Sequence, residues 1–258
     1  MAVEQLFAQW LALLGALWWP FVRALALLSA TPVIGENMVP ITIRVLLALV
    51  IAVVLLPVAE QPEAVEAFSL AAVVLTIEQV VIGVAIGLAF HLTMAVVMVL
   101  GYTVSSQMGL AMAVMNDPMN GTSSDVVSML LYILSILVFF SIDGHLVVAG
   151  VLGKSFDAWP VGGGLDTLAL QSVAFGAAWV FAAALLLAAP VIFSALVVQV
   201  GFGFLNRVAP SFNLFSLGFS LVTVFGLFML TQIVRFIPDH YVRMTNQVLG
   251  MLGRYLGG

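Results

Sequence analysis

The residues of this chain that are best suited to acid–base, metal or phosphate chemistry do not form a recognisable site. His91, His145 and His240 lie far apart, with no HExxH pattern and no acid at ligand spacing. The stretch GVLGKS (150–155) is too short between its glycines for a phosphate-binding loop, and GFGFLN (201–206) lacks the third glycine of a dinucleotide fingerprint. The chain has no cysteine, which removes thiol chemistry and disulfides. We therefore expect no catalytic residue, no metal, no cofactor and no enzymatic activity.

Two ionisable side chains lie inside apolar runs, where they could carry ions or protons across a membrane. Arg23 lies in the first run, and Glu78 lies about ten residues into the third. Such groups are costly in lipid and face protein or a wet cavity. A proton path needs more than one isolated acid, so a structural pair or a snorkelling Arg23 is the favoured interpretation. Our hypothesis is that Glu78 serves assembly rather than transport.

A row of methionines lies in SSQMGLAMAVMNDPMNG, residues 105–121. Met108, Met112, Met115 and Met119 are spaced by four, three and four residues, which would place them on one face of a helix. Core filling in a packed helix is one interpretation of this spacing, since methionine adapts to irregular contacts. The neighbouring Gly109 and Asp117-Pro118 are helix breakers, however, and several polar residues nearby are poor neighbours for lipid.

Non-helical backbone at membrane depth is tolerated where it is buried in protein or lines an aqueous cavity. Apolar constrictions can also gate pores by excluding water. The alternative hypothesis is therefore a deformable apolar loop over residues 105–121 that lines a conduit.

The composition defines the setting of these residues. Apolar residues make up 64% of the 258, and charged residues only 7%, against roughly 45–50% and 25% in a soluble domain. The formal net charge is −5, and the sequence contains no cluster of basic residues. It therefore gives no support to nucleic-acid binding. The sequence predicts an integral membrane protein made of a single domain over residues 1–258.

Six apolar runs separated by short polar breaks predict an all-α protein with about six long helices, arranged as hairpins, and a non-helical central loop. The third run would be about 50 Å long as one helix, beyond a hydrocarbon core of about 30 Å. Pro190 predicts a kink in the fifth run. The positive-inside rule gives no clear orientation, which suggests that some runs are buried against protein. The runs cover approximately residues 6–30, 38–59, 68–100, 126–152, 173–205 and 212–237.

Small residues in the third run predict close helix packing. A spacing of four residues separates Gln79, Gly83 and Gly87. The two glycines form a GxxxG pair that lets a second helix approach closely, and the Gln79 amide can hydrogen-bond to that helix. This pattern is common in membrane helices and indicates packing rather than a mechanism.

Four segments resemble the bacterial FliR family, whose injectisome counterparts belong to the same family. The segments are WPFVRALALLSATPVIGENMVPITIRVLLAL (19–49), SSQMGLAMAVMNDP (105–118), DGHLVVAGVLGKSFDAWPVGG (143–163) and GFLNRVAPSFNLFSLGFSL (203–221). The last is similar to the most recognisable family motif, with Asn206, Arg207, Pro210, Asn213, Phe215 and Gly218 in place. Ser211 and Ser220 depart from common family patterns, which have glutamine and proline there.

The resemblance implies a subunit of the gate of the type III protein export apparatus, in the bacterial inner membrane at the flagellar basal body. It implies assembly with several copies each of FliP and FliQ, contact with FlhB and with lipid, and passage of unfolded flagellar proteins. It favours a flagellar over an injectisome system. It also implies that the loop containing Met108, Leu110, Met112, Met115, Asp117 and Pro118 helps to plug the pore.

Two other functions remain open from the sequence. A small-solute secondary transporter would be expected to carry inverted repeats with broken helices at corresponding positions, and the break at 105–121 has no evident counterpart. A purely structural assembly subunit of a membrane complex is the other alternative.

Overall fold

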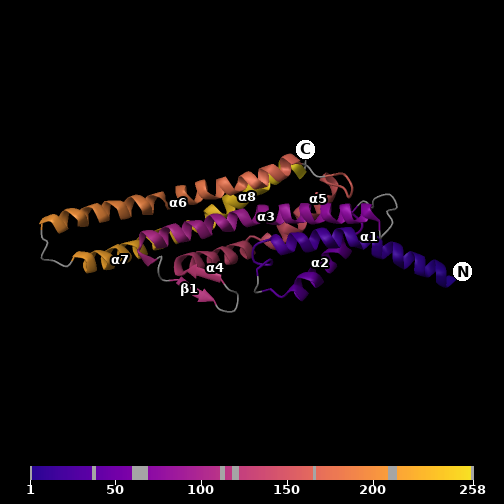
Figure 1. Cartoon of the computed structure of the whole chain (residues 1–258), viewed down its shortest axis with the longest axis horizontal. Helices are drawn as coiled ribbons and strands as arrows, with labels where there is room; N and C mark the ends of the chain where they lie inside the picture. Colours follow the sequence, from indigo (N-terminus) through magenta and orange to yellow (C-terminus); the bar gives the residue numbers. More distant parts are fainter. Residues whose placement is uncertain are drawn as a thin grey trace. The chain divides into compact units, whose positions relative to one another are not determined.

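The computed structural model describes residues 2–36, 39–59, 69–110, 114–117, 122–164, 167–208 and 214–256. These residues form eight α-helices and two short strands (Figure 1). The helices are α1 (Ala2–Ala30), α2 (Ile41–Leu55), α3 (Leu70–Gln107), α4 (Val126–Ser141), α5 (Gly144–Ala158), α6 (Thr167–Val208), α7 (Leu214–Val234) and α8 (Ile237–Leu256), and the strands are β1 (Val114–Asp117) and β2 (Thr122–Asp125).

The prediction of an all-α membrane protein is confirmed, and each of the six apolar runs contains helix. Two details differ from the prediction. The fourth run is divided into α4 and α5, because Asp143 between them has a left-handed backbone with φ 54°. Aspartate adopts this conformation more readily than most residues do. A residue in this conformation cannot continue a right-handed helix. The residues after 237 form a helix of their own, α8.

Among the described residues, three helices are long and apolar enough to cross a membrane by length and composition, or up to five if α4–α5 and α7–α8 each count as one broken span. The helix α3 has 38 residues and α6 has 42, which corresponds to lengths of about 57 and 63 Å. Both lengths exceed a hydrocarbon core of about 30 Å, so lipid alone cannot cover these helices. The helix α6 continues through Pro190, whose ring replaces one backbone N–H donor inside the helix.

The chain divides into two compact units, which are described separately. Unit 1 consists of Met1–His91, Asp143–Gly176 and Asn246–Gly258. Within it, α1 packs beside α2, as predicted for a helical hairpin. Its fully buried large side chains are Arg23, Leu27, Leu28, Gln79, Ile86, Leu152 and Phe156.

Unit 2 consists of Leu92–Ile142 and Ala177–Thr245. It holds β1 and β2, which pair antiparallel with Val114 opposite Asp125 and Asp117 opposite Thr122. Its fully buried large side chains are Met94, Leu100, Met108, Leu131 and Tyr241. The expectation of a single domain stays a prediction.

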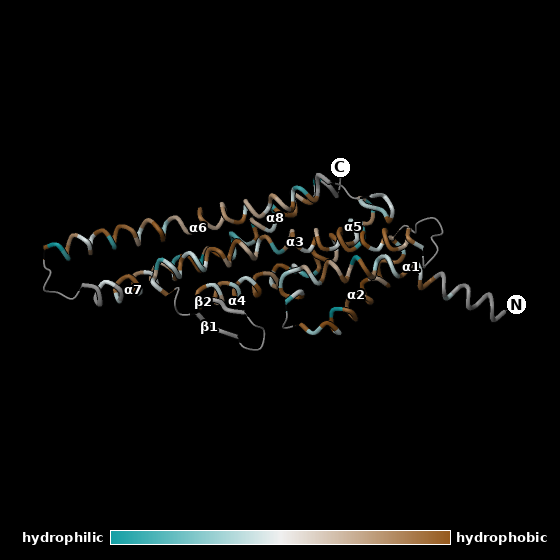
Figure 2. The backbone as a smooth tube through the Cα atoms, viewed as in Figure 1, coloured by the Kyte–Doolittle hydropathy of each residue, from teal (hydrophilic) through white to brown (hydrophobic). Residues whose placement is uncertain are grey.

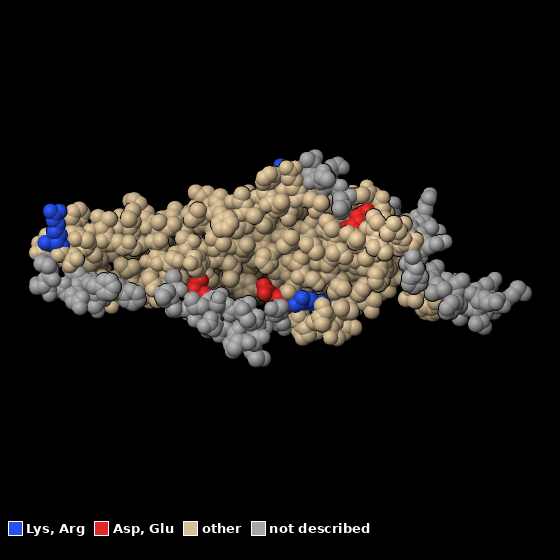
Figure 3. Space-filling view, viewed as in Figure 1, with Lys and Arg blue, Asp and Glu red and all other residues tan. Residues whose placement is uncertain are grey.

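Large apolar side chains cover much of the described surface. On α6 they include Phe175, Phe181, Phe193 and Phe204, all more than half exposed. Figure 2 shows that apolar residues dominate along most of the helices, and the face in Figure 3 carries only a few charged side chains. An apolar surface of this extent is stable only against lipid or other apolar protein surfaces, as expected of an integral membrane protein.

Candidate functional site

The loop was predicted over residues 105–121, but α3 continues to Gln107. The central loop of the structure, residues 109–124, follows α3 after a tight turn. Gly109 has φ 72° and ends the helix, as glycine commonly does after the last helical turn. Met108, immediately before it, is only 1% exposed. Its side chain fills the space beside Gly226 of α7, where a Cβ would overlap Met108 Cγ and lie 3.1 Å from Sδ. Thr223 Oγ1, one turn earlier on α7, donates a hydrogen bond of 3.0 Å to the Met108 carbonyl. We call these three residues, Met108, Thr223 and Gly226, the entry anchor.

The loop ends at a second fixed point, the start of α4. Asp125 caps this helix: its Oδ1 accepts hydrogen bonds from the backbone N–H groups of Val127 and Ser128, at 3.1 and 2.9 Å. Ser128 Oγ lies 2.5 Å from Asp125 Oδ2 and 3.1 Å from the carbonyl oxygen of Met98 on α3. A Cβ on Gly101 of α3 would lie only 2.5 Å from Ser128 Cα. We call Asp125, Ser128 and Gly101 the exit anchor.

The predicted plug residues occupy different environments. Met108 is in the entry anchor, and Leu110, half-buried, lies in the first turn of the loop. Met115 and Asp117 belong to β1, where their backbones pair with Ser124 and Thr122 of β2. Met112 and Pro118 lie outside the described residues. The backbone therefore leaves the helix before Met112, as the loop hypothesis predicted, so the four methionines do not share one helical face.

In unit 1, the buried Arg23 joins three segments of the chain. Its Nε donates to Gln79 Oε1 of α3 at 2.7 Å. Nη1 donates to the Ser155 carbonyl at 2.8 Å and lies 3.1 Å from Ser155 Oγ, and Nη2 donates to the Trp159 carbonyl at 2.8 Å. The guanidinium also lies over the Phe156 ring, 3.9 Å from its centroid, in cation–π geometry.

These contacts place the charge of Arg23 at the carboxyl end of α5. The last carbonyls of a helix lack intrahelical partners and carry partial negative charge, so a cation there is stabilised. Arg23 thus supplies a donor to the Trp159 carbonyl and a second donor to the Ser155 carbonyl, which also accepts the Trp159 N–H at 3.0 Å. The sequence interpretation of Arg23 as a structural group stays a prediction.

Glu78 is linked to Arg23 through Gln79. Its Oε1 accepts a bond from the Gly162 N–H at 3.1 Å and lies 3.4 Å from Gln79 Nε2. Gly162 follows α5 and has φ 87°, a conformation that favours glycine. The acid therefore holds the turn after α5, while Arg23 holds the end of α5 itself. The segment DGHLVVAGVLGKSFDAWPVGG (143–163) contains Ser155, Phe156 and the turn after α5. Its residues therefore serve to bind Arg23 and Glu78 within unit 1.

Gly83 and Gly87 lie directly against α1. A Cβ on Gly83 would be 2.5 Å from the Arg23 carbonyl oxygen, and one on Gly87 would be 2.6 Å from that of Leu27. Trp18 Nε1 also donates to Thr76 Oγ1 at 3.1 Å between the same two helices. The glycines allow the backbones of α1 and α3 to approach closely enough for Arg23 to reach Gln79.

The residues of the 203–221 motif lie at the ends of α6 and α7. Asn206 and Arg207 are exposed in the last turn of α6. Phe215 and Gly218 belong to α7, and a Cβ on Gly218 would be 4.0 Å from the Phe202 ring. Pro210 and Asn213 lie outside the described residues. Among the described residues, no group of three or more His, Asp or Glu side chains is placed to hold a metal ion.

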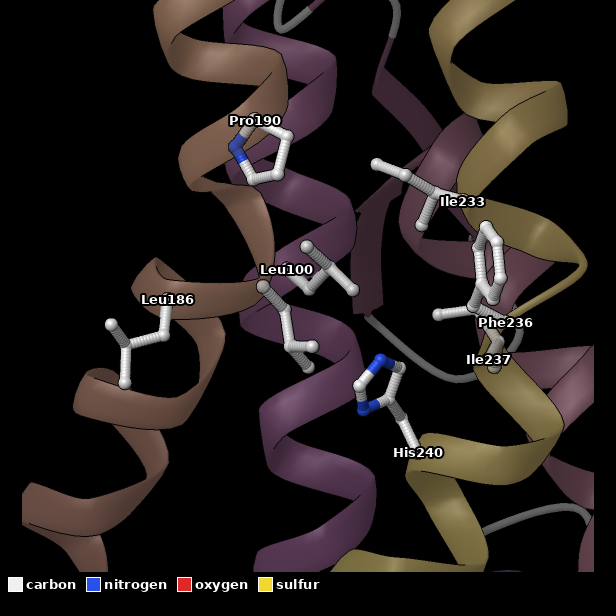
Figure 4. Close-up of a pocket in the computed structure, with 8 residues that line it drawn as sticks. Leu100, Leu186, Pro190, Ile233, Phe236, Ile237 and His240 are labelled. Carbon is white, nitrogen blue, oxygen red and sulfur yellow. The ribbon is translucent and has the colours of Figure 1, made fainter.

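Unit 2 also contains an apolar cavity of about 290 Å³. It lies where Pro190 of α6 and Leu100 of α3 face the junction between α7 and α8 (Figure 4). Ile233 is in the last turn of α7, and the ring of His240 on α8 points into the cavity. The cavity therefore borders the end of α7 that is remote from the motif residues.

Sequence reasoning missed most of the anchoring residues. Met108 was marked by the methionine spacing, and Asp125 had a signal because an aspartate directly before an apolar run is a helix N-cap pattern. Gly226 and Ser128 belong to apolar runs, and Gly101 directly follows one; small residues are ordinary there, so nothing in the sequence marks them.

Comparisons with known proteins agree with these features. The family described as bacterial export proteins, family 1, matches residues 14–248. The flagellar biosynthetic protein FliR of Pectobacterium carotovorum is 36% identical over 243 residues, which cover 92% of this chain and 91% of that protein. FliR of Escherichia coli K12 is 30% identical over 245 residues, with 95% and 94% covered. The surface presentation of antigens protein SpaR of Salmonella typhimurium is 27% identical over 187 residues, with 71% and 70% covered.

The chain is therefore an integral membrane protein that belongs to bacterial export protein family 1. The resemblance to the FliR family that the sequence predicted is confirmed.

Proposed function

We propose that this chain is a subunit of the gate through which the type III apparatus exports unfolded flagellar proteins. The observation that carries the proposal is the family match over residues 14–248, which includes both anchors and the central loop between them. The relatives from Pectobacterium carotovorum and Escherichia coli are named as flagellar biosynthetic proteins and are more similar to this chain than SpaR is, which favours flagellar over injectisome use.

Within this gate, the central loop helps to seal the conduit. The loop carries Met112 and Met115, and both of its ends are held by helices of unit 2. Methionine is unbranched and adapts to changing contacts, so an apolar segment that contains it can close around a gap, exclude water, and deform when a polypeptide passes. Leu110 contributes to this seal, and Asp117 with Pro118 keeps the segment from extending α3 as a helix.

The gate requires other subunits. We propose several copies each of FliP and FliQ, with FlhB as a further contact, in the inner membrane at the flagellar basal body. The over-long helices α3 and α6 support this assembly, because apolar surface beyond the bilayer needs cover from apolar protein. Arg207 and Asn206, exposed at the end of α6, are available for such contacts.

The proposed function is tested by deleting the gene in its own organism. We expect loss of motility and of secreted flagellar subunits, both restored by a plasmid copy, because no conduit forms without this subunit. Membranes of the complemented strain are solubilised in mild detergent, and a tagged copy is isolated. A stable hetero-oligomer supports the gate. Motile cells lacking the gene, or a lone chain that transports solutes in liposomes, would contradict it.

A further inference from the structure

We infer that Met108 is a fixed joint rather than part of the seal, and that α7 sets the position of the central loop through this joint. The inference rests on the proposed sealing function of the loop. It assigns Thr223 and Gly226 of α7 as positioning residues for the seal, although neither lies in the loop itself.

The burial of Met108 separates it from the surface that could line a conduit. A residue that is 1% exposed within its own chain presents almost no surface to a conduit, whatever other subunits are added. The side chain fills the space above Gly226, and its backbone carbonyl accepts a bond from Thr223. Met108 is thus held by both its side chain and its main chain, which is what a joint requires.

The contacts of α7 with Met108 come from a single face of that helix. Thr223 and Gly226 are three residues apart, so both contacts lie on the same side. Closely packed atoms transmit displacement rather than absorb it. A shift of α7 along or about its axis therefore moves Met108, and with it the first residues of the loop.

The two ends of the loop differ in their contact with α7. Both anchors involve α3, because the Met108 N–H donates to the Val104 carbonyl at 3.1 Å and Ser128 packs on Gly101 and the Met98 carbonyl. Only the entry anchor also contacts α7, through Thr223 and Gly226. A movement of α7 against α3 therefore acts on the entry anchor and not on the exit anchor.

The helix α7 has space in which to move. Close packing ordinarily fixes a helix, but the last turn of α7 borders the 290 Å³ cavity through Ile233. The helix also ends there, since Arg235 and Phe236 form a turn before α8 begins. A cavity beside a helix end permits small shifts that a filled core would resist.

The test uses the assembled complex and single cysteines, because the chain has none of its own. Leu110→Cys reports on the start of the loop, and its rate of reaction with a maleimide is measured on the band of this chain. Gly226→Ala forces Met108 out of its place, and we expect the cysteine at position 110 to react about tenfold faster, equivalent to about 1.4 kcal/mol. The matched control is Gly201→Ala on α6, where a Cβ meets nothing within 4 Å and no change is expected.

A double substitution separates the joint from general damage. Met108→Ala removes the side-chain atoms that the methyl group of Gly226→Ala would overlap. Met108→Ala alone should also speed the reaction of the cysteine at position 110 with maleimide, because the packing of the Met108 side chain against α7 is lost. The double variant should react more slowly than either single variant, since the methyl group added at position 226 occupies the vacated space. A cysteine at the fully buried Leu131 must stay unreactive throughout, because its reaction would report opening of the whole unit.

Ion leak through the same complexes distinguishes this inference from the proposed function. If deletion of residues 109–116 causes a leak but Gly226→Ala and Met108→Ala leave the position-110 cysteine at its original rate, the joint is wrong and the seal stands. If the deletion complex is tight, the sealing function is wrong, whatever the labelling shows. If Gly226→Ala chains do not assemble, Met108→Ala alone decides the question, and an unchanged rate overturns the inference.

Discussion

Replacing Arg23 with methionine should prevent stable accumulation of the chain in the membrane. The substitution leaves Gln79 Oε1 and the Trp159 carbonyl without their donors, and it takes one of two donors from the Ser155 carbonyl, which keeps the bond from the Trp159 N–H. It also removes the charge that balances the end of α5. Each buried acceptor left without a donor costs about 1–3 kcal/mol. This is a large part of a typical stability of about 5–15 kcal/mol, so the chain should be degraded.

The measurement is the amount of full-length chain in washed membranes, followed by limited proteolysis. Arg254→Met, at an exposed position on α8, is the control and should accumulate normally. Arg23→Lys should fail almost as completely as methionine, because one ammonium cannot reproduce the planar fork that reaches three partners. Normal amounts of protease-resistant Arg23→Met chain would contradict the structural role of this cluster.

Replacing Glu78 with glutamine tests whether the acid next to this cluster has a structural or a transport role. Its amide oxygen can still accept the bond from Gly162, so assembly and export should both stay near normal. Loss of export with normal assembly would instead indicate that Glu78 carries protons or ions.

Replacing Gly83 with alanine should separate α1 from α3. The added methyl group would lie 2.5 Å from the Arg23 carbonyl oxygen and 2.8 Å from Ala26 Cβ, and neither can swing away as a flexible side chain does. Overpacking of this kind costs about 1–3 kcal/mol. Gly83→Ala with Gly87→Ala should cost more, because the second methyl group meets the Leu27 carbonyl oxygen at 2.6 Å.

The same membrane and proteolysis assays measure this effect. Gly150→Ala on α5 is the matched control, since a Cβ there meets nothing within 4 Å. That change should be neutral or stabilise the chain by about 0.5–1 kcal/mol, because alanine favours helix over glycine. Equal behaviour of Gly83→Ala and Gly150→Ala would show that the close approach of α1 and α3 is unimportant.

The sequence predicted the helices well, because apolar runs in lipid have few alternatives to helix. It also predicted a non-helical central loop within residues 105–121, where breakers and polar residues coincide. The division between α4 and α5 was missed, because Asp143 is a single residue in an otherwise apolar run. The helix α8 was also missed, since it is separated from α7 only by the turn at Arg235 and Phe236.

The contacts that hold the site could not be predicted. The partners of Arg23 are 56 to 136 residues away in the chain, and two of its acceptors are backbone carbonyls, which every residue possesses. The space beside Gly226 is defined only by Met108, more than a hundred residues earlier. Contacts between residues so far apart in the sequence depend on the whole fold, and local sequence patterns do not reveal them.

The proposed seal between the two anchors is tested most directly by the ion conductance of purified complexes in planar lipid bilayers. The decisive complex contains this chain with residues 109–116 deleted. Complexes of the same subunit composition with the natural chain serve as the control and should stay closed. We predict steady ion leakage through the deletion complex, and a deletion complex as tight as the control would contradict the sealing function of the loop.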